Sequence, residues 1–498
     1  MLSRVNLALI ALSVIILFVQ SSAPCQALPL RTLLLEIQSL DAAALKGTPL
    51  VYDDYARDAV LSDVRGRKLV LATHAEAALL HERGIQFSVL LEDSSQLTLA
   101  KRAFYGPSML MPAVYHTYER MMDEVDSLAK LYPQLIRKFP IGTTEQGGKT
   151  IFAVRITEGV NKRQDKPAIL FDGCHHSDEV MGAEICMALI HKLVSEHGND
   201  PEISDWLRRF VVVVVPVVNV DGHGVVTHNI DPRWRKNTRD TNGNGILHEY
   251  PEGVDLNRNY DFNWAHGGSD DSSSERYRGA YPFSESENRA IRQLAMSERF
   301  LCSITYHSQG EVIYYPWNWS GKKAPDDVLL TSMANGLASS IRTMAGDTCY
   351  KAEYGAGTVG QSYPWLYGTL GTFDFIIETG KGAAIFPPEE VTGIVMSNLA
   401  GVRYFLNRAK GPGLTGHVVD GRSGKPLHAT VWFPAIETEE VRRRTTEPQF
   451  GRYTRLLLPG KYSMIVSCEG YQTKVLRNVE VGKGEWTTVD VRLEPVKM

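Results

Sequence analysis

The feature that most constrains the fold is the apolar run at residues 210–218, which contains no charged side chain. It is too short to span a membrane and is typical of a strand buried on both faces of a parallel sheet. A second strand-like apolar segment lies at residues 168–171, and helical periodicity is found at 118–132 and 184–194. This alternation continues over residues 115–409 and predicts an α/β domain with a mixed, mostly parallel central sheet flanked by helices.

The regions on either side of this domain have a different character. Residues 28–110 combine strand-like segments at 68–72 and 87–91 with a helical segment at 75–83, which predicts a small α/β domain. Short alternating strands separated by glycines follow residue 411 and predict a small β-sandwich. The predicted organisation is a signal peptide at 1–27, the small domain at 28–110, the large α/β domain at 111–410 and the sandwich at 411–498.

The amino terminus has the organisation of a secretory signal peptide. Arg4 precedes an apolar run at residues 7–19, and small and polar residues follow up to Ala27, where cleavage is expected. No later segment approaches the roughly 18 continuous apolar residues of a membrane span. The sequence therefore predicts a secreted or periplasmic protein with no stable membrane span after cleavage.

Composition narrows the range of partners. The formal net charge of -4 gives no polycationic surface, so no nucleic-acid partner is expected. The cysteines that remain after cleavage are irregularly spaced, and we expect buried side chains rather than a disulfide framework. The sequence carries no indication of an oligomeric state.

A candidate metal site begins in the segment Gly-Cys-His-His-Ser-Asp-Glu at residues 173–179, directly after an apolar strand. A histidine and a glutamate three residues apart can turn toward one point and supply half of a catalytic zinc site. His307 ends another apolar strand-like segment, and two histidines with one carboxylate leave the fourth tetrahedral position open for water. The spacing alone allows two registers, because His175 with Asp178 has the same separation as His176 with Glu179.

These motifs together resemble the carboxypeptidase A-like family of zinc metallocarboxypeptidases, over roughly residues 115–410. The resemblance selects His176, Glu179 and His307 as the zinc ligands. It also implies that Asn257 and Arg258 receive the terminal carboxylate of the substrate, a role suited to a bidentate guanidinium.

The resemblance implies further catalytic residues. Arg235, in a Trp-Arg-Lys segment, would polarise the scissile carbonyl and stabilise the oxyanion. Glu378, in the apolar segment 373–380, would accept the proton of the zinc-bound water and deliver it to the leaving amine. The family's mobile tyrosine that closes over the substrate is assigned to Tyr354, with Tyr350 and Tyr363 as alternatives.

The expected activity is zinc-dependent hydrolysis of the C-terminal peptide bond of peptides or proteins. Gln361, Ser362, Tyr363 and Ile376 would line the pocket for the terminal side chain and favour apolar or aromatic residues. Glu311 would instead favour a basic or diamino side chain, which keeps open a zinc peptidase acting on bacterial cell-wall stem peptides. A non-catalytic peptide- or glycan-binding protein on the same fold is a third hypothesis, although neither Glu378 nor a zinc ligand is missing.

Three further expectations concern the remaining segments. Asp240, Asn242 and Asn244 alternate as in the start of a calcium loop, with Glu249 and Glu252 nearby; a plain Asn/Gly turn is the alternative. By the resemblance, residues 28–110 occupy the place of a propeptide removed at Lys101-Arg102, unless they form a permanent domain. The sandwich resembles the transthyretin-like regulatory domains of secreted carboxypeptidases and is expected to aid stability or surface attachment.

Overall fold

The computed structural model of the protein describes residues 32–38, 60–64, 67–91, 111–245, 251–319, 321–355 and 359–496. The predicted signal peptide at 1–27 and the predicted processing point at Lys101-Arg102 lie outside the described residues. No helix in the described ranges is both long enough and apolar enough to cross a membrane.

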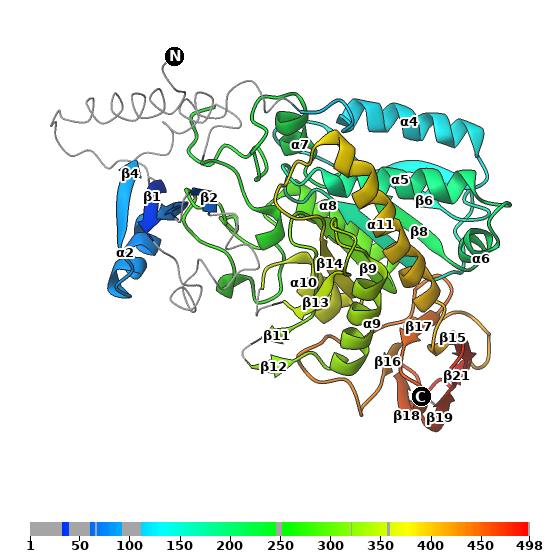
Figure 1. Ribbon diagram of the computed structural model, residues 1–498. Helices are drawn as coiled ribbons and strands as arrows, with labels where there is room; N and C mark the ends of the chain where they lie inside the picture. The colour runs from blue at the N-terminus through cyan, green and yellow to red at the C-terminus, as the bar shows by residue number, and fades with distance from the viewer. Residues whose placement is uncertain are drawn as a thin grey trace, which may run out of the picture.

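An eight-stranded sheet with the strand order β13-β10-β14-β9-β7-β8-β6-β5 lies at the centre of the molecule (Figure 1). Its strands are β5 (Ile136–Thr143), β6 (Thr150–Ile156), β7 (Ala168–Gly173), β8 (Val211–Val215), β9 (Cys302–His307), β10 (Val312–Tyr315), β13 (Lys351–Tyr354) and β14 (Phe373–Glu378). The pairs β7–β8, β7–β9, β9–β14 and β10–β13 are parallel, whereas β5–β6, β6–β8 and β10–β14 are antiparallel. The predicted mixed sheet is confirmed.

The apolar run at residues 210–218 forms the inner strand β8, which is shorter than the run itself. The strand stops at Val215 because Pro216 lacks the N–H that a ladder requires. The buried side chains of Val217 and Val218 continue the core beyond the strand.

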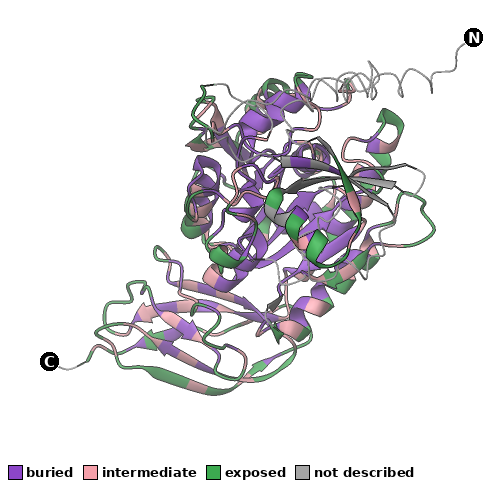
Figure 2. Cartoon of the chain, turned by 90° about the vertical axis from the view of Figure 1, so that its left-hand side faces the viewer, coloured by how far each residue is buried: buried purple, intermediate pink, exposed green. Residues whose placement is uncertain are grey.

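Helices pack around the sheet, and α4 (Tyr118–Leu131) illustrates why they form. The hydroxyl of Thr117 accepts a hydrogen bond from the backbone N–H of Arg120 and caps the helix, while Met121, Val125 and Leu128 are buried on one face. The other helices are α5 (Met181–Ser195), α6 (Pro201–Arg209), α7 (Val220–Thr227), α8 (Ser286–Glu298), α9 (Asp327–Ser340), α10 (Ser362–Trp365) and α11 (Pro388–Arg408), with short turns η3 (Leu256–Arg258), η4 (Trp264–His266) and η5 (Leu366–Leu370). Helix α11 contacts both α5 and α9. Figure 2 shows that buried residues fill the interior of the larger part of the molecule, around the central sheet.

The described amino-terminal elements form an antiparallel four-stranded sheet of order β2-β3-β1-β4 with one helix against it. They are β1 (Thr32–Gln38), β2 (Val60–Val64), β3 (Arg67–Thr73), α2 (His74–Glu82) and β4 (Phe87–Leu91). The elements β3, α2 and β4 occur where the sequence predicted them, whereas β1 and β2 were not predicted.

The carboxyl-terminal region consists of two small sheets, drawn in orange to red in Figure 1. They contain β15 (Gly413–Asp420), β16 (Thr430–Trp432), β17 (Arg452–Leu456), β18 (Gly460–Ser467), β19 (Lys474–Val481), β20 (Trp486–Thr488) and β21 (Val491–Leu493). Buried side chains such as Leu414, Val418, Val431 and Met464 form a separate apolar core. A β-rich region is therefore present as predicted.

The remaining described strands, β11 (Asn318–Trp319) and β12 (Lys322–Lys323), pair with each other in an antiparallel manner.

Candidate active site

Three strands bring the candidate catalytic residues to one edge of the sheet. Strand β9 ends at His307, strand β14 ends at Glu378, and β7 ends at Gly173, just before the His-His segment. Because these strands are parallel, their carboxyl ends meet at the same edge. The position of the site therefore follows from the topology of the sheet.

The turn after β7 depends on two glycines that touch each other. A Cβ atom on Gly173 would lie 2.7 Å from the carbonyl carbon of Gly182 at the start of α5, which a real side chain does not tolerate. Cys174 adopts a left-handed backbone conformation with φ 55° immediately afterwards. This close passage turns the segment carrying His176 and Glu179 back over the sheet edge.

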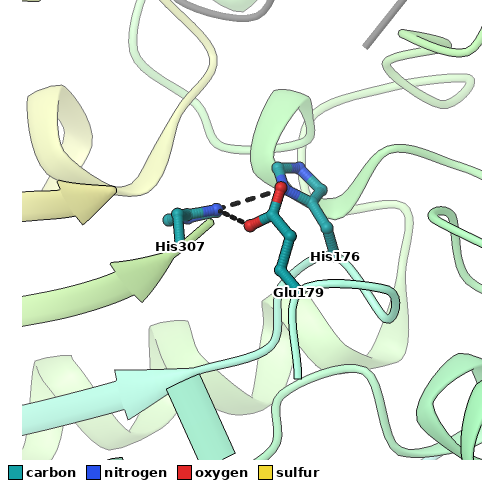
Figure 3. A group of neighbouring side chains, drawn as sticks. All are labelled: His176, Glu179 and His307. Carbon is teal, nitrogen blue, oxygen red and sulfur yellow. Dashed lines mark hydrogen bonds and ion pairs between the residues drawn. The ribbon is translucent and has the colours of Figure 1, made fainter. Parts of the chain in front are cut away.

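His176, Glu179 and His307 form one buried group, drawn in Figure 3. A nitrogen or oxygen atom from each residue lies within 4.8 Å of the others. Glu179 Oε1 lies 2.8 Å from His176 Nδ1, and Glu179 Oε2 lies 2.7 Å from His307 Nδ1. Two imidazole nitrogens and one carboxylate form a donor set suited to a catalytic zinc ion, so the residues present fit this metal.

The neighbouring histidine is directed elsewhere. His175 Nε2 lies 2.7 Å from the hydroxyl of Tyr260, and its Nδ1 lies 3.5 Å from Asp172 Oδ1. Its ring also faces that of His307, with an interplanar angle of 20°. The geometry therefore favours the register of His176 with Glu179 over that of His175 with Asp178.

Each of the three group members is oriented by a further contact. Asp255 Oδ1 lies 3.0 Å from His176 Nε2, and the amide nitrogen of Asn257 lies 3.2 Å from His307 Nε2. The backbone N–H of Ser308 donates to Glu179 Oε2 at 3.2 Å. The Asp255 carboxylate accepts the Nε2–H of His176 and so directs its Nδ1 lone pair toward the group, as metal ligation requires; the amide nitrogen of Asn257 is a donor and positions the ring of His307 without fixing this tautomer.

The electrostatics of the group match this interpretation. Although burial opposes ionisation, His176 and His307 hold the pKa of the Glu179 carboxyl well below its usual value. Burial lowers the pKa of His307 to about 4, which keeps that imidazole neutral. The pKa of His176 rises to about 9 because, against burial and Arg235, the carboxylates of Glu179 and Asp255 favour its charged form; a bound cation would compete with that proton.

Arg235 lies against the same group and is almost fully buried. Its Nη1 donates to Glu179 Oε1 at 3.0 Å, and its Nη2 lies 3.0 Å from His176 Nε2. Its segment is attached to the His176 loop, because the backbone N–H of Ser177 donates to the Arg235 carbonyl at 3.0 Å. The predicted carbonyl-polarising arginine is thus next to the candidate metal ligands.

Asn257 and Arg258 lie in the turn η3, and both side chains are buried. The side-chain oxygen of Asn257 accepts from the backbone N–H of Ser362 at 3.0 Å, in addition to the contact of its amide nitrogen with His307. Arg258 Nη1 donates to the carbonyl of Asn257 at 2.9 Å and lies 4.0 Å from Asp255 Oδ2. The turn therefore joins the predicted carboxylate-binding residues to the metal group.

Glu378 is buried at the end of β14, where its register partners are His307 on β9 and Val312 on β10. A small apolar cluster lies beside it and consists of Val312, Tyr314, Tyr363 and Ile376. Glu311 precedes Val312 but does not belong to this cluster. Its carboxylate accepts a hydrogen bond from the backbone N–H of Met344 at 2.6 Å.

The three candidate tyrosines have different surroundings. The hydroxyl of Tyr354 donates to Asp327 Oδ1 at 2.5 Å and accepts from Lys323 at 2.8 Å, so the side chain is attached to α9. The hydroxyl of Tyr350 accepts from the backbone N–H of Gly380 at 2.9 Å. Tyr363 is fully buried in the apolar cluster beside Glu378. The substrate-closing role of Tyr354 stays a prediction; its side chain contacts Asp327 on α9, Lys323 on β12 and the ring of Tyr315 on β10.

The candidate calcium loop has the contacts of a turn. Both carboxylate oxygens of Asp240 accept backbone N–H groups, from Gly243 at 2.6 Å and Gly245 at 2.8 Å. The side-chain oxygen of Asn242 accepts from the N–H of Asn244 at 2.9 Å. These contacts are those of an Asx-type turn, and calcium binding is not supported; Glu249 lies outside the described residues.

Sequence reasoning did not identify Asp255 or Tyr260 as parts of the site, and it named His175 only as an alternative metal ligand. Asp255 lies two residues before Asn257 in the same motif, but an aspartate before a turn is common and its partner His176 is distant in sequence. The second histidine of the His-His pair was a visible signal that His175 has a separate partner. Only the folded chain shows that this partner is Tyr260.

A buried His-Glu-His donor set beside a glutamate, at the carboxyl edge of a mixed sheet, defines the class of mononuclear metallohydrolase sites. A profile described as zinc carboxypeptidase matches residues 121–397, and a second, described as carboxypeptidase regulatory-like domain, matches residues 413–494. The chain therefore belongs to the zinc carboxypeptidase family. It is a metallocarboxypeptidase, a zinc-dependent hydrolase of peptides.

Individual relatives agree with this assignment. The chain is 26% identical to mouse (Mus musculus) carboxypeptidase A4 over 349 residues, which cover 67% of this chain and 81% of the relative. It is 27% identical to bovine (Bos taurus) carboxypeptidase B over 300 residues, which cover 58% of this chain and 69% of that relative.

Solved structures share the fold. Carboxypeptidase A from Helicoverpa armigera superposes with a TM-score of 0.57 at 20% identity, covering 76% of this chain and 97% of that one. Thrombin activatable fibrinolysis inhibitor superposes with a TM-score of 0.56 at 21% identity, covering 76% of this chain and 98% of that structure's chain.

Proposed function

We propose that this protein is a secreted or periplasmic carboxypeptidase that hydrolyses the C-terminal peptide bond of peptides, using Glu378 as general base. The observation that carries the proposal is the juxtaposition of the buried His176–Glu179–His307 group with Glu378 on the adjacent strand. A buried carboxylate on an apolar strand is costly unless positive charge lies nearby, and a cation held by this donor set would offset that cost.

In the proposed mechanism His176, Glu179 and His307 hold one zinc ion. When bound, zinc acidifies a water molecule and polarises the substrate carbonyl. Glu378 accepts a proton from the attacking water and delivers it to the nitrogen of the leaving amino acid. The water oxygen bonds to the carbonyl carbon, the C–N bond breaks, and the proton passes from Glu378 to the amine.

Arg235 is proposed to stabilise the negative charge that develops on the scissile carbonyl oxygen. A guanidinium directed at this oxygen acts mainly in the transition state and therefore contributes to the rate. In the unliganded chain its N–H groups contact Glu179 and His176, so substrate binding would redirect one of them. Its burial next to the metal group removes the competing solvent.

Restriction to the C-terminal residue is assigned to Arg258 and Asn257. A planar guanidinium binds a carboxylate through two parallel hydrogen bonds, which an internal peptide bond or an amide cannot accept in the same way. Arg258 is fully buried, so it binds a substrate group without competition from bulk water. The contact of Asn257 with His307 sets the distance between this clamp and the metal.

The apolar cluster beside Glu378 supports a preference for apolar or aromatic terminal side chains. Val312, Tyr314, Tyr363 and Ile376 supply no charge that would pair with a basic substrate residue. Glu311, the basis of the cell-wall alternative, accepts the backbone N–H of Met344 through one carboxylate oxygen, and this contact supports the apolar preference over a diamino one.

The remaining assignments rest on the sequence. We infer that residues 1–27 direct export and are removed by cleavage after Ala27. We also infer that residues 28–110 form a propeptide-like domain, with cleavage at Lys101-Arg102. Residues 111–410 are then the catalytic domain, and residues 411–498 are the terminal domain. Mass spectrometry of the natively exported protein tests the first two points. An active form that still begins near Leu28 would contradict propeptide removal.

The function is tested with peptides that differ only in the C-terminal residue, each paired with a C-amidated twin. We expect the zinc-loaded protein to release single amino acids from free C-termini ending in apolar or aromatic residues and to leave the twins intact. Cleavage of the twins at the same rate would contradict the carboxylate clamp. Release only from peptides with a terminal diamino acid would establish the cell-wall alternative, and binding without hydrolysis would establish a non-catalytic role.

A further inference from the structure

A cavity of about 60 Å³ lies between the α/β domain and the terminal sandwich, far in sequence from the metal ligands. Arg299, Phe300, Leu301 and Phe373 line it from the first region, and Phe433, Arg444, Thr445, Arg452 and Arg455 line it from the second. A cavity of about 10–15 Å³ holds one water molecule, so this one has room for several waters or for a small tetrahedral anion. Neither the metal site nor the family assignment gives this cavity a function.

The charged residues that line the cavity are mostly arginines. They are Arg299, Arg444, Arg452 and Arg455, and the only lining residue of opposite charge in the described chain is Glu447. The carboxylate of Glu447 pairs with Arg163 at 3.0 Å and accepts the N–H of Phe450 at 2.7 Å. Glu447 is therefore already engaged.

Three of the four lining arginines have carboxylate partners. Arg455 donates from Nη2 to both oxygens of Asp326 at 2.8 and 2.9 Å. Arg444 pairs with Glu437 at 2.8 Å. Arg452 pairs with Asp165 at 2.9 Å.

Arg299 has no carboxylate partner in the described part of the chain. Its Nη1 donates to the hydroxyl of Thr445 at 2.6 Å, its Nη2 lies 3.4 Å from His428 Nε2, and its Nε has no hydrogen-bond partner among described residues. Desolvation lowers the pKa of Arg299 from its usual value. Glu447 partly offsets the charge of Arg299, but this carboxylate already pairs with Arg163, so one positive charge remains in excess in a partly dry environment, where an anion would offset it.

Arg455 supplies additional donors on the other wall. Its exposed fraction is 2%, and its Nε and Nη1 atoms have no hydrogen-bond partner among the described residues. The ring of Phe373 lies 5.4 Å from this guanidinium and contributes a cation–π contact. This contact leaves Arg455 Nε and Nη1 without a nitrogen or oxygen acceptor among the described residues, so these donors remain available.

We propose that this cavity is a binding site for a tetrahedral oxyanion such as phosphate or sulfate, held by Arg299 from the α/β domain and Arg455 from the sandwich. The anion neutralises the excess charge. It also bridges Arg299 of the α/β domain to Arg455 of the sandwich and so adds a link between the two regions. Its binding stabilises their association, because a ligand that binds the assembled form alone shifts the unfolding equilibrium.

The test uses the zinc-loaded full-length protein, with inorganic phosphate and sulfate as probes and chloride at matched ionic strength as the reference. Thermal unfolding of the wild type is expected to show a Tm increase on the order of 2 °C for each tenfold rise in phosphate above its Kd. Arg299→Gln is expected to weaken phosphate binding at least tenfold, as measured by calorimetry, with peptide hydrolysis unchanged. Arg443→Gln, which removes an exposed neighbouring arginine outside the cavity, is the control and is expected to behave as the wild type.

Two results would overturn the proposal. The first is an equal Tm increase with chloride, which would indicate a general salt effect. The second is an unchanged phosphate response in Arg299→Gln, which would place the anion elsewhere, including at the metal site that this variant retains. If Arg299→Gln does not fold, Arg299→Lys keeps the charge without the guanidinium fork, and weaker phosphate binding is again expected.

Discussion

Glu378 is the register partner of His307 across the parallel pair of β14 and β9, so both side chains leave the carboxyl edge of the sheet on the same face. The distance between the proposed general base and the proposed metal ligand is therefore set by backbone hydrogen bonds. A register shift of one residue would turn Glu378 to the opposite face. The fold itself thus aligns the two groups.

The contact between Asp255 and His176 gives the first prediction. Asp255→Asn removes the charge that orients the imidazole, and we expect the zinc affinity to fall about 10–100-fold. Competition with a chelator measures the zinc Kd. The exposed Asp123→Asn on α4 is the matched control, and an unchanged Kd in Asp255→Asn would show that Asp255 does not support the metal group.

Arg258 gives the second prediction. Arg258→Lys keeps the positive charge but loses the bidentate fork, so kcat/KM for peptides with a free C-terminus should fall about 10–100-fold. Rates are measured on peptides with a free C-terminus, and zinc content is measured in parallel. A loss of zinc content as large as the loss of rate would mean that Arg258 maintains the fold of η3 rather than binding the carboxylate.

The ion pair between Asp326 and Arg455 gives the third prediction, on stability. The pair joins the end of the loop before α9 to β17 and is almost fully buried. Although burial opposes it, Arg455 holds the pKa of Asp326 below its usual value. Arg455→Met leaves the buried carboxylate of Asp326 with only the longer contact to Arg444 at 3.5 Å as an ion pair, and should cost up to about 3–5 kcal/mol in denaturant unfolding.

A second substitution distinguishes the charge from simple packing. Asp326→Asn combined with Arg455→Met removes the orphaned carboxylate and should recover part of the lost stability. If the double variant is as unstable as the sum of the single ones, the pair contributes through packing alone.

Asp374 gives the fourth prediction, on pH dependence. Desolvation raises the pKa of this buried carboxyl to about 7, whereas its value in an unfolded chain is near 3.8. Between these values the unfolded state releases a proton that the folded state retains, so stability falls as pH rises from about 4 to 7. Asp374→Asn cannot ionise and should lose this dependence.

Urea unfolding at pH 5 and pH 8 measures the effect of Asp374→Asn. The free energy of unfolding of the variant, relative to that of the wild type, should be higher at pH 8 than at pH 5. The difference should be on the order of a few kcal/mol at most. A stability difference that is identical at both values would show that Asp374 does not titrate in this range.

Local sequence signals predicted much of the fold. The apolar run at 210–218 identified a buried inner strand, and the helical periodicity at 118–132 identified α4, because both depend on nearby residues. The edge strands β17 and β19 were not predicted: β17 pairs with β15, which is distant in sequence, and most side chains of β19 are exposed or half-buried.

The candidate site was predictable to the extent that its residues follow recognisable motifs. His176, Glu179 and His307 occur in order at strand ends, and the structure brings them together. The position of Tyr354 was not predictable, because its hydroxyl is held by Asp327 on α9, a contact that no local pattern encodes. Asp255 and Tyr260 were missed for the same reason: each acts through a residue about 80 positions away.

The most direct test of the account is the activity of Glu378→Gln at known zinc content. The substitution keeps the size of the side chain but removes the proton acceptor, so kcat for a free C-terminal peptide should fall about 10²–10⁴-fold with zinc content unchanged. Removal of zinc from the wild type should abolish hydrolysis, and its return should restore it. If zinc-loaded Glu378→Gln hydrolyses the peptide at the wild-type rate, Glu378 is not the general base and the proposed mechanism is wrong.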